Sequence, residues 1–136
     1  MSGSRRALQA VVAIAALVPL SVATLSLVRG PRWLGQLPPI ATDLDSHFRY
    51  LSGIFLALGL AFVSCIPAIE RKGPRLRLLG ALVIAGGLGR LWSLMQVGAP
   101  SAGHLVGLGI ELGVVPLVLI WQAIDARVGT EAAPGA

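Results

Sequence analysis

The chain is short of charge, of aromatic side chains and of cysteine. Of its 136 residues, 12% are charged and 5% are aromatic, and Cys65 is the single cysteine. A soluble domain usually carries about 25% charged residues, so the deficit argues against an ordinary soluble surface. A lone cysteine excludes an internal disulfide and a thiolate zinc site. Because Cys65 lies in an apolar run, we interpret it as a small buried packing residue.

Acidic residues are also scarce. Six Asp and Glu oppose eleven Lys and Arg, for a formal net charge of +5. The positive charges stand at the ends of apolar runs, without the interleaved aromatics of a nucleic-acid surface, so we expect membrane lipids and not nucleic acid as partners. The sequence also lacks a nucleophile elbow, a phosphate loop and paired catalytic carboxylates. We assign no catalytic residue, no cofactor and no metal ligand; the cluster Asp43–His47 has unspecific spacing for a metal site.

Long apolar runs dominate what is present. Hydrophobic residues make up 55% of the chain, and a run of about 20 apolar residues is enough to span a membrane as a helix. We predict an all-α integral membrane four-helix bundle, a single domain over residues 1–128, followed by a disordered tail over 129–136. The predicted spanning helices cover about 7–28, 47–68, 76–97 and 103–125.

The first run has a second interpretation. Arg5 and Arg6 resemble the basic start of a signal peptide, and Ser21–Ala23 resembles a small-residue cleavage site. The run is nevertheless long enough to span, so we interpret it as a retained helix.

The basic residues predict an orientation, because short cytoplasmic loops are enriched in Lys and Arg. With four spans, one side collects seven basic residues and the other only Arg29 and Arg32. Both termini are therefore expected on the cytoplasmic side of a multi-pass protein. The seven are Arg5, Arg6, Arg71, Lys72, Arg75, Arg77 and Arg127.

Two opposite charges interrupt the last two apolar runs. At 1.5 Å rise per residue, Arg90 and Glu111 each lie roughly 11–12 Å below the outer boundary, on helices joined by a short connection. An unpaired charge in the bilayer is costly, so we predict that they face each other. His104 lies two turns before Glu111 on the same helical face.

The start of the second run adds Asp45 and Arg49, an i,i+4 pair in the favourable order. We predict a polar cluster in the outer half of the bundle. This cluster either binds a ligand or is a buried polar group of the bundle interior. Its members are Asp45, Arg49, Arg90, His104 and Glu111. The structural alternatives stay open: Arg90 and Glu111 as a pair that fixes helix register, Asp45 and Arg49 as a surface pair, and His104 as an interfacial side chain.

Glycine and proline shape the remaining expectations. Small residues crowd the third and fourth runs, where they permit close helix packing. Pro19 and Pro116 are expected to kink the first and fourth helices. The segment 29–45 is the one long connection, and Thr42–Asp45 supplies N-cap candidates for the second helix.

Several short motifs together resemble a known family. They are Asp45 with Arg49–Gly53, Gly89–Leu91 with Ser93, Gly98 with Pro100, Glu111, and Pro116–Leu117. Over roughly residues 43–122 the chain is similar to the bacterial membrane proteins grouped as domain of unknown function 4345. The resemblance implies a four-helix protein of the bacterial cytoplasmic (inner) membrane and draws attention to Arg49, Arg90 and Glu111. It implies no activity.

Three functions fit these observations. The first is binding of a lipid or another hydrophobic ligand through the polar cluster. The second is an accessory subunit that packs, through its glycine-rich faces, against a larger membrane complex or a second copy. The third is an intramembrane isomerase-like enzyme using His104 or Glu111. The absence of a catalytic motif favours the first two.

Overall fold

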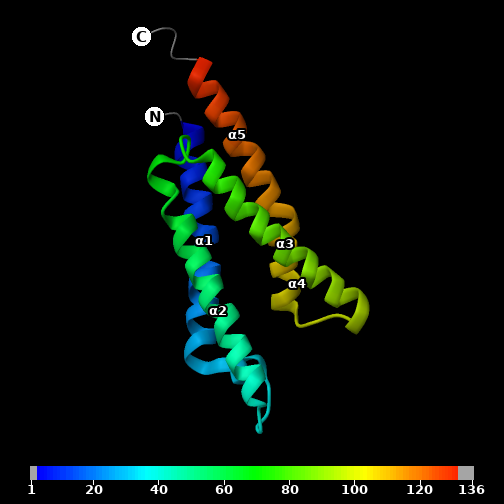
Figure 1. Cartoon of the computed structure of the whole chain (residues 1–136). Coiled ribbons are helices and arrows are strands. Elements are labelled where there is room, and N and C mark those ends of the chain that lie inside the picture. Colours follow the sequence, from blue (N-terminus) through cyan, green and yellow to red (C-terminus); the bar gives the residue numbers. More distant parts are fainter. Residues whose placement is uncertain (1–2, 132–136) are drawn as a thin grey trace. The chain divides into compact units, whose positions relative to one another are not determined.

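A computed structural model describes the backbone of residues 3–131 and the side chains of residues 3–128. This part of the chain is helical and contains no strand, which confirms the all-α prediction (Figure 1). The elements are α1 (Gly3–Arg29), the 3-10 helix η1 (Gly30–Leu34), α2 (Thr42–Val63), the 3-10 helix η2 (Ile66–Ala68), α3 (Gly73–Val97), α4 (Ala102–Gly109), the π-helix η3 (Ile110–Val114) and α5 (Val115–Glu131).

Four helical runs are long and apolar enough to cross a membrane, as predicted. They are Gly3–Leu34, Thr42–Ala68, Gly73–Val97 and Ala102–Val128. Large apolar side chains such as Ile14, Leu78 and Leu117 are exposed on these helices. Such surfaces are unfavourable in water and suit a lipid environment.

The chain divides into two compact units, which are described separately. The first consists of residues 3–9 and 67–131, and so contains the start of α1 together with α3, α4, η3 and α5. The second consists of residues 10–66 and contains the rest of α1 with η1 and α2.

The second helix begins earlier than predicted, and the predicted N-cap is wrong. Ala41 occupies the N-cap position of α2, which starts at Thr42, and no side chain caps it. Asp43 and Asp45 instead lie in the first turn, where negative charge stabilises the positive end of the helix dipole. Asp45 is also engaged with Arg49, which leaves it unsuited to a capping role.

Pro116 interrupts the fourth apolar run in a specific way. It has no backbone N–H, so it cannot complete the regular hydrogen-bonding pattern of an α-helix. The chain widens just before it into π-helix η3, where the Val115 N–H donates to the Ile110 carbonyl, five residues back. The predicted break at Pro116 therefore takes the form of a π-turn that contains Glu111. Pro19, in contrast, lies inside an unbroken α1.

The structure describes only the first three residues, 129–131, of the tail that was predicted to be disordered. Helix α5 continues to Glu131, into the segment 129–136 that was expected to be disordered. Residues 132–136 lie outside the described part of the chain.

Two glycines of α3 allow the fourth run to pack closely in the first unit (Figure 1). A Cβ atom at Gly80 would lie 2.6 Å from Leu119 Cδ1, and one at Gly87 would lie 2.8 Å from Leu112 Cδ2. The glycine-rich pattern thus has a direct use here, since Leu119 of α5 and Leu112 of η3 occupy the space that a side chain would need.

Gly87→Ala and Gly86→Ala form a matched test of this packing. At Gly87 the new methyl group meets Leu112 and also Glu111 Cβ at 2.9 Å, whereas at Gly86 it meets nothing within 4 Å. We expect Gly87→Ala to destabilise the folded protein by about 1–3 kcal/mol, as in other overpacked sites. Gly86→Ala should leave stability unchanged or slightly higher. Thermal unfolding in detergent measures both, and equal losses would contradict the packing argument.

Candidate functional site

Arg49 and Asp45 form an ion pair on the first two turns of α2. Arg49 Nε lies 2.8 Å from Asp45 Oδ2, and Arg49 Nη2 lies 3.3 Å from Asp45 Oδ1. The side chains are 39% and 37% exposed, respectively. The i,i+4 pairing predicted from the sequence is confirmed.

The same guanidinium also caps the end of α1. Arg49 Nη1 donates to the Leu27 carbonyl, and the Val28 carbonyl lies 3.4 Å from the same nitrogen. The last carbonyls of a helix have no partner within the helix, and a positive charge there favours the negative end of its dipole. Arg49 therefore joins the end of α1 to the start of α2, a role that the sequence analysis missed.

Gly30 makes this contact possible. Its backbone has a positive φ of +62°, which ordinary side chains rarely adopt. A Cβ atom there would also lie 2.5 Å from Asp45 Oδ1 and 2.7 Å from Arg49 Nη2. Glycine thus ends α1 and leaves room for the ion pair.

Helix η1 is held against α1 by an indole hydrogen bond. Trp33 Nε1 donates to Ser26 Oγ at 3.0 Å, and Ser26 is only 3% exposed. Trp33 therefore has a packing role, because this bond joins η1 to the last turns of α1.

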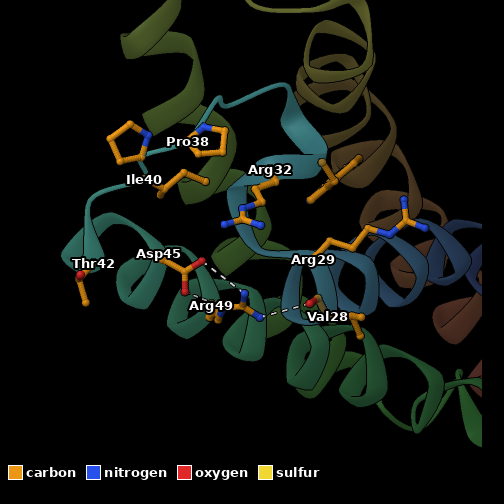
Figure 2. Close-up of a pocket in the computed structure, with 10 residues that line it drawn as sticks. Val28, Arg29, Arg32, Pro38, Ile40, Thr42, Asp45 and Arg49 are labelled. Carbon is orange, nitrogen blue, oxygen red and sulfur yellow. Dashed lines mark hydrogen bonds and ion pairs between the residues drawn. The ribbon is translucent and has the colours of Figure 1, made fainter.

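These elements enclose a polar pocket of about 960 Å³ within the second unit, which we call the arginine pocket (Figure 2). In Figure 2 the guanidinium of Arg32 points toward Asp45 and Arg49, whereas that of Arg29 points away from the pair. Three arginines and one carboxylate line the pocket, so it carries an excess of positive charge. The lining residues are Val28, Arg29, Arg32, Trp33, Pro38, Pro39, Ile40, Thr42, Asp45 and Arg49.

A second, shallow hollow of about 700 Å³ lies along α1, open on its outer side, and is called the apolar groove. Its lining residues recur at helical spacing on one face of α1. Val28 and Arg29 line both the groove and the arginine pocket, so the two hollows are neighbours at the end of α1. The groove is lined by Leu17, Leu20, Ser21, Thr24, Leu25, Val28 and Arg29.

Arg90 and Glu111 face each other in the first unit, as predicted. Arg90 Nε lies 3.0 Å from Glu111 Oε2, and Arg90 Nη2 lies 3.1 Å from Glu111 Oε1. This two-bond arrangement is the strong geometry for an arginine and a carboxylate. Glu111 is the more buried partner, with 13% of its side chain exposed against 33% for Arg90. Its Cβ lies beside Gly87, so the close packing described above holds the carboxylate against α3.

His104 contacts neither charge through a hydrogen bond in the described structure. Its Nδ1 lies 2.9 Å from Ser101 Oγ, three residues earlier, at the start of α4. The hydroxyl of Ser101 thus engages one ring nitrogen.

The five residues of the predicted cluster therefore fall into local groups. Asp45 pairs with Arg49 in the second unit, while Arg90 pairs with Glu111 in the first, and His104 contacts Ser101. A single pocket containing all five stays a prediction. The arginine pocket adds Arg29 and Arg32, which the sequence analysis used only for orientation. The sequence did contain one signal for these two arginines: they stand on either side of Gly30 and Pro31, directly before Trp33.

Polar contacts at the start of α1 were also missed. Arg5 pairs with Glu70 at 2.6 Å, and Trp121 Nε1 donates to Ser4 Oγ at 3.0 Å. Gln122, which is 1% exposed, donates to the Ile69 carbonyl at 3.0 Å. These bonds tie residues 3–9 and the segment before α3 to α5, within the first unit.

Among the side chains of residues 3–128, no group of His, Cys, Asp or Glu is arranged to hold a metal ion.

Comparison with known protein families assigns the chain to one of them. The family model described as "Domain of unknown function (DUF4345)" matches residues 7–122. The chain belongs to this family. No curated protein and no solved structure matches the chain significantly.

Membership confirms the resemblance and extends its range. The motifs quoted above covered roughly residues 43–122, whereas the DUF4345 match begins at residue 7. It thus includes α1 beyond its first turn, and η1 with both arginines of the pocket. Each residue of the arginine pocket, and the Arg90–Glu111 pair, lies in the DUF4345 region.

The Arg90–Glu111 pair can be tested by removing one charge and then both. Arg90→Met leaves a half-buried carboxylate without its partner, and we expect a loss of at most about 3–5 kcal/mol, the range for broken buried pairs. The double variant Arg90→Met/Glu111→Leu should recover most of this loss, because no charge stays unpaired. Thermal unfolding in detergent compares the two. A double variant as unstable as the single one would show that the pair does more than neutralise its two charges.

Proposed function

We propose that this protein is a multi-pass protein of the bacterial cytoplasmic membrane that binds an amphipathic anion. The head group of the ligand lies in the arginine pocket, and its hydrocarbon tail lies in the apolar groove. The observation that carries the proposal is that the two hollows are neighbours, since Val28 and Arg29 line both.

The charge of the arginine pocket supports an anionic head group. Asp45 compensates one of the three arginines, and Arg49 is further engaged by the carbonyls at the end of α1. Arg29 and Arg32 are exposed, and their guanidinium groups form no hydrogen bond or ion pair with other described residues, although the charge of Arg32 acts on Asp45. Their guanidinium groups are therefore the hydrogen-bond donors available to a ligand, while Arg49 joins α1 to α2 at the side of the pocket.

The apolar groove supports a hydrocarbon tail. Leucines supply its walls, and the hydroxyls of Ser21 and Thr24 donate to the Leu17 and Leu20 carbonyls at 2.7 Å. The polar atoms of the groove are thus already bonded within α1. A hydrocarbon chain lying there loses no hydrogen bond, and it replaces ordinary membrane lipid along the helix.

The membrane orientation follows from the basic residues. The excess of Lys and Arg at the N-terminus and between α2 and α3 favours a cytoplasmic location for those segments. In this orientation both termini are cytoplasmic and the arginine pocket faces the outer leaflet.

Native mass spectrometry of the protein released from its own membrane tests the proposal. We expect a reproducible small added mass that weakens in Arg29→Ala and Arg32→Ala, because each loses a charged donor worth about 1.5–3 kcal/mol, or tenfold and more in affinity. Arg75→Ala is the matched control: Arg75 is exposed on α3 and lies outside the pocket. Retention of the added mass in both pocket variants would refute the proposal.

A second function, that of an accessory subunit, has one observation in its favour. Several glycines of the fourth run have open space where a side chain would be: a Cβ atom at Gly103, Gly107, Gly109 or Gly113 would meet nothing within 4 Å. Two of the intervals are four residues long, the spacing at which small residues let membrane helices approach closely.

Site-directed cross-linking separates this function from ligand binding. Gly107→Cys in a Cys65→Ser background introduces one accessible thiol on the helix face that carries Gly103 and Gly107. An accessory subunit predicts a cross-link to one defined polypeptide in native membranes, which Gly103→Leu should reduce by blocking close approach. A cysteine at Leu78, which is exposed on α3, serves as the control position. Equal labelling at both positions would contradict a specific docking face.

A further inference from the structure

We infer that the head group in the arginine pocket is a terminal phosphate, a dianion, and not a carboxylate or a phosphodiester. This inference rests on the proposed binding of an amphipathic anion and adds the chemical class of its head group. The argument uses the charge of the pocket, its free donors and the shape of the adjoining groove.

The charge of the pocket matches a dianion. Arg29, Arg32 and Arg49 contribute three positive charges, and Asp45 contributes one negative charge, which leaves two positive charges uncompensated. A terminal phosphate carries about −1.5 to −2 at neutral pH, whereas a carboxylate or a phosphodiester carries a single negative charge. Only the terminal phosphate neutralises the pocket by itself.

The free donors lead to the same ligand. A guanidinium forks onto two oxygens, so one arginine suffices for a carboxylate. Two arginines whose donors form no described hydrogen bond, Arg29 and Arg32, border one pocket and come from adjacent elements, α1 and η1. A terminal phosphate has three oxygens, each able to accept more than one hydrogen bond. It can therefore accept from Arg32 and also from Arg29, once the exposed side chain of Arg29 turns toward the head group. The hydroxyl of Thr42 lines the same pocket and is a further donor.

The groove fits one hydrocarbon chain. All of its lining residues come from one face of α1, from Leu17 to Arg29. At 1.5 Å rise per residue this strip is about 18 Å long. The lining residues form two neighbouring rows on this face, 17/21/25/29 and 20/24/28, and the one furrow between them matches a ligand with one tail beside the head group. A two-chain phosphodiester lipid would place its second chain outside the groove.

Ligands that share a tail and differ in their head group test the inference. Tetradecyl phosphate, tetradecyl sulfate and myristate are titrated against the full chain in phosphatidylcholine nanodiscs, with inorganic phosphate as a tail-free competitor. Near neutral pH we expect the phosphate to bind about tenfold more tightly than the sulfate or the carboxylate. Arg29→Ala and Arg32→Ala should each remove most of this advantage, and Arg75→Ala should retain it.

The pH dependence supplies an independent readout. The second pKa of a phosphate monoester is about 6, so lowering the pH from about 7.5 to about 5 converts the dianion to a monoanion. The advantage of the phosphate over the sulfate should then disappear. The charged groups that line the pocket are Arg29, Arg32, Arg49 and Asp45, and the sulfate titration corrects for any change in them. His47, which contacts Tyr50, does not line the pocket.

The outcomes distinguish the inference from the proposed function. Equal affinity for the three amphiphiles, or a phosphate advantage unchanged at low pH, would overturn the inference and leave amphipathic anion binding in place. If none of the amphiphiles binds, both are refuted. If inorganic phosphate competes as strongly as tetradecyl phosphate, the head-group assignment stands and the role of the apolar groove is refuted.

Discussion

Arg49 holds together the region around the arginine pocket. Its guanidinium reaches the carbonyls at the end of α1, while its Nε contacts Asp45 in the first turn of α2. One side chain thus satisfies the negative end of one helix and pairs with a carboxylate at the positive end of the next. The ion pair occupies the space beside Gly30, so only a residue without a side chain fits at this turn between α1 and η1.

The first unit shows a comparable dependence on one pair of charges. Glu111 lies in a π-turn next to Pro116, and Arg90 meets it from α3 with two hydrogen bonds. Gly87 allows the backbones to approach closely enough for this geometry. In an apolar segment, each charge would be costly without the other. The pair therefore specifies how α3 and η3 face one another, more than it adds stability.

The arginine pocket and the Arg90–Glu111 pair differ in what remains available to a ligand. In the pair, the hydrogen-bonding groups of both side chains are directed at each other. In the pocket, Asp45 forms hydrogen bonds with Arg49 and interacts with Arg32 through charge alone, so the guanidinium donors of Arg29 and Arg32 are not used in a described hydrogen bond. This difference is the reason for proposing ligand binding at the pocket and a structural role for the pair. A charge excess beside an apolar groove is the arrangement that an amphipathic anion requires.

The sequence by itself determined the helical class, four apolar spans and both ion pairs. These follow from local properties: run length, i,i+4 spacing, and the cost of an isolated charge in an apolar segment. It did not reveal the capping of α1 by Arg49, the anchoring of η1 by Trp33, or the pocket containing Arg29 and Arg32. Each depends on which backbone carbonyl or hydroxyl a side chain reaches after the chain turns at Gly30. Only the tertiary structure decided this, because such contacts join residues separated by a turn and leave no periodic pattern in the sequence.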